Sequence, residues 1–186
     1  GTITVTERKP FAMALNPGWN MVSIPGEPAD SDINAVISAT HPASTVLTYD
    51  PSVAGGWLTA IRGDDGLFAG TLTSITAARA YWIHTTTFEA ISVTIPRMAS
   101  GVATLPPTIA IAVGWNFVPV LDVTGGSVKT GDKGIVQTTY LANLTISRVY
   151  SFGTVANAWT QVAADGNMST GNGYWVYATK VGFIVP

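Results

Sequence analysis

The sequence predicts an all-β protein made of two tandem homologous units, each a β-sandwich or barrel-like module with one short helix. Charged residues make up only 11% of the chain, against about 25% in an average globular protein, and strand and turn formers dominate the rest. Apolar and polar residues alternate in several short runs, which indicates strands. The phrase GWNMVSIP at 18–25 returns as GWNFVPVL at 114–121. Together these observations indicate an internal duplication.

The six tryptophans support the duplication because they form three pairs in the same order and in similar local sequence. The spacing within the pairs varies, as insertions in surface loops permit. The last strands are matched as SVTIP, ending at Pro96, with GFIVP, ending at Pro186. The three pairs are Trp19 with Trp115, Trp57 with Trp159, and Trp82 with Trp175. The predicted organisation is a leading strand or the end of a preceding module at 1–9, a first unit at 10–96, a linker at 97–107 and a second unit at 108–186.

The first unit is expected to begin with a turn at MALNPGW, which leads into the alternating strand NMVSIP. A short helix follows in DINAVISAT, where the apolar residues have helical spacing and Asp30 or Ser31 is the expected N-cap. STVLTYD and GWLTAIR are expected to form a hairpin around PSVAGG, a loop of turn-forming residues. YWIHTT and ISVTIP are the expected closing strands.

The second unit repeats these elements in the same order. GWNFVPVL is its first strand, TTYLANL a weaker helix, ISRVYSF and AWTQVA the hairpin around GTVANA, and YWVYAT and GFIVP the closing strands. MASGVATLPP, with small residues and prolines, is typical of a linker. TITVTE near the N-terminus alternates like a strand and has no Met before it, so we expect a piece of a longer protein.

Composition argues against several classes of protein. Nine Lys and Arg residues are scattered singly and the net charge is −2, whereas nucleic-acid binding needs clustered cations. The chain has no cysteine, which excludes a disulfide framework, a thiolate metal site and a Cys nucleophile. No apolar run approaches the ~20 residues that span a bilayer, and no signal-peptide pattern is present. We therefore expect no nucleic-acid partner and no insertion into a membrane.

The motifs follow one order in both units: GWN before an alternating strand, Tyr and Trp across a hairpin, and Tyr-Trp in a closing strand. This order resembles the tandem GWN/GYW β-modules of large secreted and surface-layer-type proteins of bacteria and archaea. The resemblance covers residues 16–96 and 113–186. The second unit has the full GNGYWVYA, whereas the first has ARAYWIHT and lacks the glycine turn. The resemblance implies an architecture and a surface context, and it brings no catalytic residue.

Candidate catalytic and metal-binding side chains are few. His41 lies in a loop and His84 in a predicted strand, and we interpret both as surface or strand-edge residues. Asp64 and Asp65 form the acidic cluster of a Gly-flanked loop, a weak calcium candidate because alternating oxygen ligands and a third acid are missing. The RGD triplet at 62–64 in the same loop is short enough to arise by chance. We expect no enzyme activity, no cofactor and no bound metal.

The aromatic residues are the informative set. Because consecutive strand residues point to opposite faces of a sheet, one member of each Tyr-Trp pair must face outward or into the interface between units. Large rings bury about 150–250 Å² each, and we favour packing for the whole set, with stacking platforms for sugars as the alternative. In that alternative Trp82 and Trp175 are the candidate glycan contacts. The structural signature consists of Gly18, Trp19, Asn20, Trp57, Tyr81, Trp82, Gly114, Trp115, Asn116, Trp159, Tyr174 and Trp175.

The predicted function is that of a non-catalytic structural or adhesive module in a larger extracellular, cell-surface or S-layer-like protein. The alternative is a carbohydrate-binding module that uses exposed aromatic side chains. Expected partners are neighbouring modules of the parent protein, copies of this chain, and glycans. Two sequons, at Asn143 and Asn167, would permit glycosylation in an archaeal or eukaryotic host. Exposed paired aromatic residues would favour sugar binding, and an uninterrupted packed seam between the units would favour a scaffold.

Overall fold

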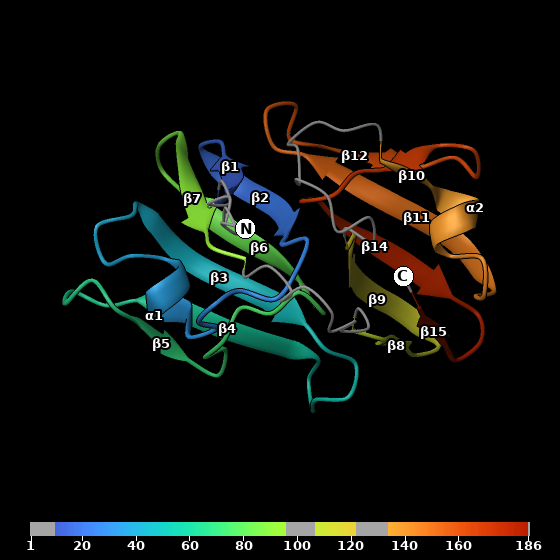
Figure 1. The fold of residues 1–186 in the computed structure, drawn as a ribbon, viewed down its shortest axis with the longest axis horizontal. Helices are drawn as coiled ribbons and strands as arrows, with labels where there is room; N and C mark the ends of the chain where they lie inside the picture. The colour runs from blue at the N-terminus through green and yellow to red at the C-terminus, as the bar shows by residue number, and fades with distance from the viewer. Residues whose placement is uncertain (1–9, 96–106, 122–133, 186) are drawn as a thin grey trace, which may run out of the picture.

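The computed structural model describes residues 10–95, 107–121 and 134–185. Within these ranges the chain forms antiparallel sheets and two helices of four residues each, so the all-β prediction is confirmed. Figure 1 shows two bodies side by side, which we call the first half (10–95) and the second half (107–121 and 134–185). The predicted leading strand at 1–9 and the predicted linker, except Pro107, lie outside the described residues.

The first half is built on a five-stranded sheet in the order β2-β6-β3-β4-β5, accompanied by the two-stranded sheet β1-β7. One short helix, α1 (Ile33–Val36), connects β2 to β3. The strands are β1 (Phe11–Leu15), β2 (Gly18–Ser23), β3 (Ala43–Tyr49), β4 (Trp57–Arg62), β5 (Phe68–Gly70), β6 (Ala80–Thr85) and β7 (Glu89–Val93).

The second half has the same central order, β9-β14-β11-β12, and β8-β15 takes the place of β1-β7. The strand β10, which pairs with β13 in a small sheet, directly precedes the helix α2 (Gln137–Tyr140). In both halves a bulge interrupts the third strand, between Ala43 and Thr45 in β3 and between Ile146 and Arg148 in β11. The strands are β8 (Ile109–Ile111), β9 (Gly114–Pro119), β10 (Ile135–Val136), β11 (Ile146–Gly153), β12 (Ala158–Gln161), β13 (Asn167–Met168), β14 (Gly173–Ala178) and β15 (Gly182–Ile184).

The recurring GWN phrase forms the turn that leads into β2 and β9. Gly18 and Gly114 have φ angles of +100° and +98°, a region that a residue without a side chain adopts readily. The side chain of Asn20 accepts a hydrogen bond from the N–H of Asn16 at 2.9 Å and donates one to its carbonyl at 2.8 Å. Asn116 makes the same two bonds, at 2.9 and 2.8 Å, with the residue four positions before it. The GWN phrase therefore stabilises a turn through its Asn, and its Trp points to the face of the strand opposite to that Asn.

The Tyr-Trp pairs of β6 and β14 divide between the two faces of their sheets. Tyr81 and Tyr174 are buried, at 1% and 3% exposure. Each hydroxyl accepts a 2.7 Å hydrogen bond from a backbone N–H five residues earlier in the chain. Trp82 and Trp175 lie on the other face and are only half-buried. The tyrosines thus belong to the core, and the tryptophans are left for the surface between the halves.

Apolar side chains of both halves form one continuous core cluster. In the first half the inner face of the main sheet, with Val46 and Ile83, packs against β1-β7 and α1. Along β1 every second residue is buried, as the pleat of a strand demands. Phe11 of β1 also lies against Gly171 of the second half, where a Cβ would approach its ring to 2.8 Å. The two halves are therefore joined through their interiors as well as through their surfaces.

The predicted helix cap is wrong by one or two residues. Asp32, rather than Asp30 or Ser31, is the N-cap of α1, and its side chain accepts a hydrogen bond from the Asn34 N–H at 2.8 Å. The carboxylate of Asp30 instead accepts from the N–H of Asp32 at 2.9 Å. The reason is geometric, because an N-cap must directly precede the first helical residue, here Ile33.

The predicted match of SVTIP with GFIVP is also wrong. Ile91 pairs with Met13, and Ile184 pairs with Ile109 at the same place in the second half, so Ile184 corresponds to Ile91. An alignment of the two segments on their final prolines, Pro96 and Pro186, is shifted by three residues from this correspondence. Both segments alternate apolar residues, and only the pairing with the first strand of each half distinguishes the two registers.

The first half carries a segment that the described second half lacks. Asp32, the residue before α1, forms a backbone bridge with Ser74. In the second half β10, directly before α2, pairs with β13 in the same way. Between Trp57 and that bridge the first half has extra residues, which form the RGDDG loop and β5. β5 covers the edge of β4, whereas in the described residues β12 ends its sheet.

Candidate functional site

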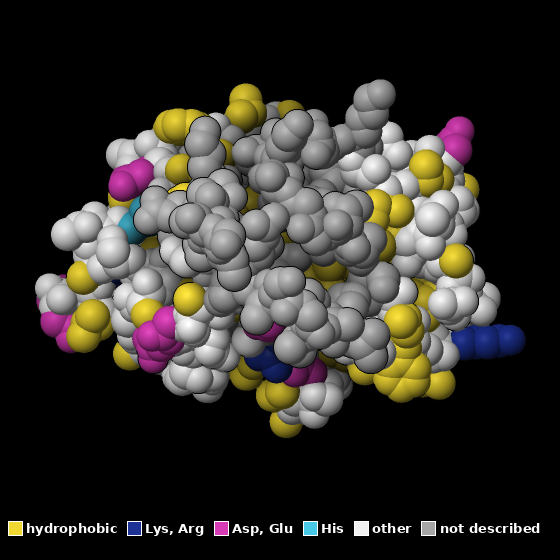
Figure 2. Space-filling model, in the orientation of Figure 1, with side chains coloured by type: hydrophobic (Ala, Val, Ile, Leu, Met, Phe, Trp, Pro, Cys, Tyr) yellow, Lys and Arg dark blue, Asp and Glu magenta, His cyan; other side chains and the backbone are white. Residues whose placement is uncertain are grey.

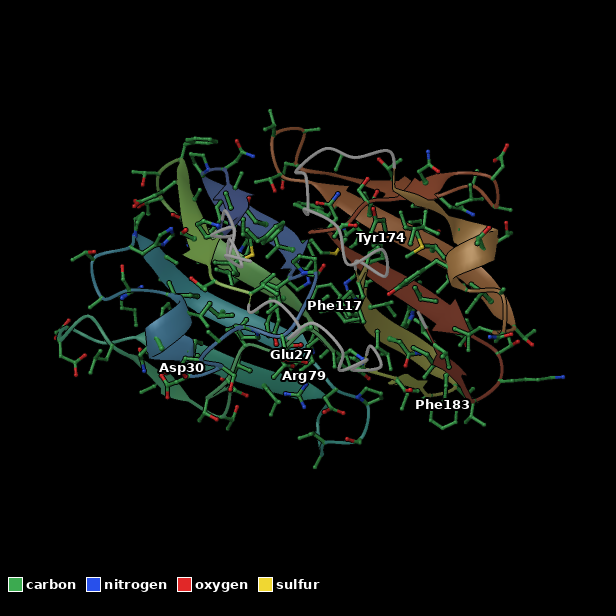
Figure 3. All side chains as sticks on the ribbon, in the orientation of Figure 1. Glu27, Asp30, Arg79, Phe117, Tyr174 and Phe183 are labelled. Carbon is green, nitrogen blue, oxygen red and sulfur yellow. The ribbon has the colours of Figure 1, made fainter. Side chains whose placement is uncertain are left out.

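The outer faces of the two main sheets pack against each other along a seam. Its centre consists of the buried side chains of Met21, Ala80 and Phe117, and Figure 3 places Phe117 at the junction of the two halves. A Cβ on Gly173 would stand 2.9 Å from the Cβ of Ala80 and 3.0 Å from the Phe117 ring. The seam therefore closes because the residue before the Tyr-Trp pair of β14 has no side chain.

Hydrogen bonds of Ser23 also cross the seam. Its N–H donates to the carbonyl of Gly171 at 2.9 Å, and its hydroxyl donates to that of Asn172 at 2.8 Å and accepts from the N–H of Val120 at 3.4 Å. Pro119 holds the same position in β9 that Ser23 holds in β2, and it has neither an N–H nor a hydroxyl. These bonds therefore have no counterpart from β9, and the seam is asymmetric.

An aromatic triad lies at one end of the seam and combines residues of both halves. The rings of Tyr49 and Trp57, paired across the β3-β4 hairpin, have centroids 5.4 Å apart. Trp175 of β14 lies 5.3 Å from Tyr49 and 5.9 Å from Trp57. We call this group the Trp175 triad.

A matching triad lies at the other end of the seam. Phe152 and Trp159, paired across the β11-β12 hairpin, are 5.3 Å apart, and Trp82 of β6 lies 5.1 Å and 5.7 Å from them. We call this group the Trp82 triad. Phe117 stacks between the triads, 6.1 Å from Trp82 and 5.1 Å from Trp175. Each triad thus takes its inner Trp from one half and its hairpin pair from the other.

The triad residues other than Phe152 line an open groove of about 580 Å³. The outer rings of the triads are well exposed, Trp57 at 43% and Trp159 at 52%. Among the residues that the structure describes, no charged side chain lines the groove, and on the face drawn in Figure 2 the charged side chains form small separate spots. A concave, aromatic, uncharged surface is typical of a ligand site. The lining residues are Tyr49, Trp57, Trp82, Trp115, Tyr150, Trp159 and Trp175.

The groove carries hydrogen-bond donors as well as ring faces. Its lining supplies five indole N–H groups and the hydroxyls of Tyr49 and Tyr150. Among the described residues, the buried side-chain nitrogen or oxygen that lacks a partner is Nε2 of His41, and no atom of the groove is in that position. Within the described residues, no side-chain donor of the groove is thus buried without a partner.

An ion pair holds the hairpin that carries Trp57. The carboxylate of Asp50 accepts hydrogen bonds from Arg79 at 2.7 Å and from the hydroxyl of Ser52 at 2.6 Å. Burial acts to raise the pKa of Asp50, but the bonds from Ser52 and the charge of Arg79 outweigh it and hold that pKa below its ordinary value. The backbone of Asp50 closes the loop by donating to the carbonyl of Gly56 at 2.7 Å.

The structure changes the expected role of the tryptophans. Core packing is wrong for four of the six indoles, which pack against a cross-strand aromatic neighbour but are between 39% and 52% exposed: Trp19, Trp57, Trp115 and Trp159. Trp82 and Trp175, the candidate glycan contacts, lie in the groove at the inner ends of the triads. Phe117 and Phe152 were missed by the sequence reasoning. Phe117 could have been found, because it follows Trp115 by two residues in an alternating strand.

The two histidines lie apart from the groove lining. The prediction of a surface histidine is wrong for His41, which is 6% exposed. Its Nδ1 accepts from the N–H of Ala43 at 3.1 Å, and burial lowers its pKa, with Glu89 acting against this shift and Arg62 adding to it. His84 lies on the outer face, with its Nδ1 2.9 Å from the hydroxyl of Ser44.

The RGDDG loop uses its charged residues to hold itself together. Asp65 accepts a hydrogen bond from the Leu67 N–H at 3.0 Å, and Asp64 is exposed. Within the described residues no three His, Cys, Asp or Glu side chains gather into a group that could hold a metal. Arg62 of the RGD triplet stacks on Phe68 at 4.3 Å. Its guanidinium donates to four carbonyl oxygens, those of Ser38, Ala39, Ala43 and Gly66.

Both sequon asparagines are exposed, Asn143 in the turn after α2 and Asn167 in β13. In the described part of the chain, neither helix has the length and apolar character needed to span a membrane. No family model matches the chain, and no curated protein or solved structure matches it.

Proposed function

We propose that the chain is a non-catalytic adhesive module of a larger extracellular or cell-surface protein, and that the groove is its ligand site. The observation that carries the proposal is the groove itself, in which seven aromatic side chains from both halves meet around an open, uncharged hollow. A concave hollow lined by aromatic side chains is the usual form of a ligand-binding site. The resemblance to tandem GWN/GYW modules supports the surface context.

A neutral carbohydrate is the ligand class that best fits this lining. The face of an aromatic ring carries partial negative charge, which attracts the weakly positive C–H groups on the face of a sugar ring. The hydroxyl oxygens at the edge of the sugar accept hydrogen bonds, and the groove offers indole and phenol donors. An anionic ligand would find no cation in the described lining, which contains neither Lys nor Arg.

The test is a titration of the whole chain with soluble cello-, xylo-, manno- and chitohexaose, in which binding is measured by calorimetry and by Trp fluorescence. We expect saturable binding of at least one sugar at sub-millimolar concentration, weakened at least about tenfold in Trp57→Ala and unchanged in Phe88→Ala. Phe88 is a matched control because it is 68% exposed and does not line the groove. Decaproline is the competing probe, since proline-rich helices also dock on aromatic grooves. Binding of decaproline alone, or of no probe, would overturn the carbohydrate proposal.

We also propose that the two halves arose by duplication. The support is the common strand order, the bulge in β3 and β11, and the identical hydrogen bonds of Asn20 and Asn116. Under this proposal Phe152, and not Tyr150, corresponds to Tyr49, because Phe152 pairs with Trp159 as Tyr49 pairs with Trp57.

A scaffold role is the second candidate, and the packed centre of the seam favours it, since Met21 and Phe117 are each 5% exposed. In that role the groove would receive a neighbouring copy or module instead of a sugar. Sedimentation of the chain at rising concentration tests this directly. Reversible association that Trp57→Ala abolishes would favour the scaffold, and a monomer at all concentrations would leave the groove free for a small ligand.

A further inference from the structure

We infer that the groove binds a glycan chain lengthwise, with the Trp175 triad and the Trp82 triad as two separate subsites. This inference rests on the proposed carbohydrate binding and adds to it the length and placement of the ligand. It follows from the way in which the aromatic residues are distributed along the seam.

The two triads are built alike. In each, the inner Trp lies 5.1–5.9 Å from the two rings of a hairpin that belongs to the other half. In each, the outer Trp is among the exposed side chains, Trp57 at 43% and Trp159 at 52%. Two similar exposed platforms at opposite ends of one groove are suited to a ligand that repeats the same chemical unit.

The distance between the triads exceeds what a single sugar ring can cover. Two ring-to-ring steps separate the inner tryptophans, 6.1 Å from Trp82 to Phe117 and 5.1 Å from Phe117 to Trp175. A sugar ring is about as wide as one of these aromatic rings, so a monosaccharide on one triad does not reach the other. A chain of several sugars reaches both, and its second contact is intramolecular, which raises the affinity without a new kind of interaction.

The triads differ in one polar group. Tyr49 supplies a hydroxyl to the Trp175 triad, whereas Phe152 takes the same position in the Trp82 triad and supplies none. Tyr150, which lines the groove, stands where the first half has Leu47, since these residues pair with Trp175 and Trp82. The Trp175 side of the groove therefore has the additional hydrogen-bonding capacity, and we assign to it the tighter subsite.

The test is a length series from disaccharide to hexasaccharide of the sugars named above, measured by calorimetry on the whole chain. We expect affinity to rise at least about tenfold between disaccharide and hexasaccharide, a change that corresponds to about 1.4 kcal/mol. Trp159→Ala should return the hexasaccharide to about the affinity of the disaccharide, and Trp57→Ala, which removes a ring of the tighter subsite, should weaken its binding further. Trp57→Phe and Trp159→Phe keep a ring and should restore part of the loss, and Phe88→Ala should behave as the wild type.

The outcomes separate this inference from the proposed function. A disaccharide that binds as tightly as the hexasaccharide would overturn the two-subsite arrangement and leave carbohydrate binding standing. The same holds if Trp159→Ala, shown by circular dichroism to be folded, binds the hexasaccharide like the wild type. Failure of every oligosaccharide to bind would overturn both. A loss of disaccharide affinity in Trp159→Ala but not in Trp57→Ala would reverse the assignment of the tighter subsite.

Discussion

The two buried asparagines of the GWN phrase hold a turn by bonding its backbone on both sides. Replacing Asn116 with Ala leaves a backbone N–H and a carbonyl four residues away without their partners. We expect the free energy of unfolding to fall by about 1–3 kcal/mol, and Asn20→Ala to behave in the same way. Urea denaturation measures this loss. Asn143→Ala, at an exposed position, is the control and should change stability by less than about 0.5 kcal/mol. Equal curves for Asn116→Ala and Asn143→Ala would contradict the assigned role.

His41 makes stability depend on pH in a defined direction. Its pKa in the folded protein lies below the ordinary value of 6.5, because burial disfavours the charged ring. Between these two values the unfolded chain binds more protons than the folded chain, so the free energy of unfolding falls as the pH falls. The loss begins near pH 6.5 and continues down to the lowered pKa.

The variant His41→Asn isolates this contribution, because an Asn side chain can still accept the hydrogen bond from the Ala43 N–H but does not titrate. We expect the wild type to lose more stability than His41→Asn between pH 7 and 5, measured by urea denaturation at each pH. Both proteins share the same carboxylates, so acid effects at Asp and Glu cancel in the comparison. Parallel curves would show that His41 has no part in the pH dependence.

At the scale of the elements, Ser23 joins β2 to the loop before β14. Ser23→Ala removes the hydroxyl that bonds the Asn172 carbonyl and the Val120 N–H in a fully buried position. We expect a loss of about 1–3 kcal/mol. Ser92→Ala on the exposed side of β7 is the matched control. A loss of the same size in both variants would mean that the bonds of Ser23 across the seam contribute nothing specific.

Much of the element order could be predicted from the sequence, because alternation and turn formers act locally. The strands around GWN, the β3-β4 hairpin and the Tyr-Trp strands lie where the pattern placed them. The register of the closing strands could not be predicted, since residues 89–93 and the residues after them alternate equally well. Only the pairing with β1 selects which of these residues form the strand. The cap of α1 was missed for a related reason, because three candidate side chains precede Ile33 within a few residues.

The site itself was less predictable than the fold. The sequence predicted that one ring of each Tyr-Trp pair faces outward or into the interface between units, but it does not show which faces meet. The triads depend on contacts between residues far apart in the chain, such as Tyr49 with Trp175. Likewise, Trp57 and Trp159 meet Trp175 and Trp82 across the seam, and these contacts join segments far apart in the chain. Neither feature has a local signature.

At the scale of the whole molecule, Gly173 sets the distance between the halves. Gly173→Ala places a Cβ 2.9 Å from the Cβ of Ala80, so we expect overpacking to cost about 1–3 kcal/mol. Adding Ala80→Gly should restore part of the loss, because it removes the atom in closest contact. The control is Gly153→Ala, where a Cβ would have ordinary contacts at 3.8 and 3.9 Å. Urea denaturation of the wild type, the two single variants and the double variant measures these free energies of unfolding. A double variant less stable than Gly173→Ala would contradict this account.

The close approach of indoles across the seam also has an optical consequence. Trp57 lies 5.9 Å from Trp175, and Trp82 lies 5.7 Å from Trp159, and each of these pairs joins the two halves. At such distances the electronic transitions of two indoles couple and split into bands of opposite sign in circular dichroism. The far-ultraviolet spectrum should therefore contain an exciton couplet superimposed on the β-sheet signal. Its loss on warming would report the parting of the halves even while each sheet remained folded.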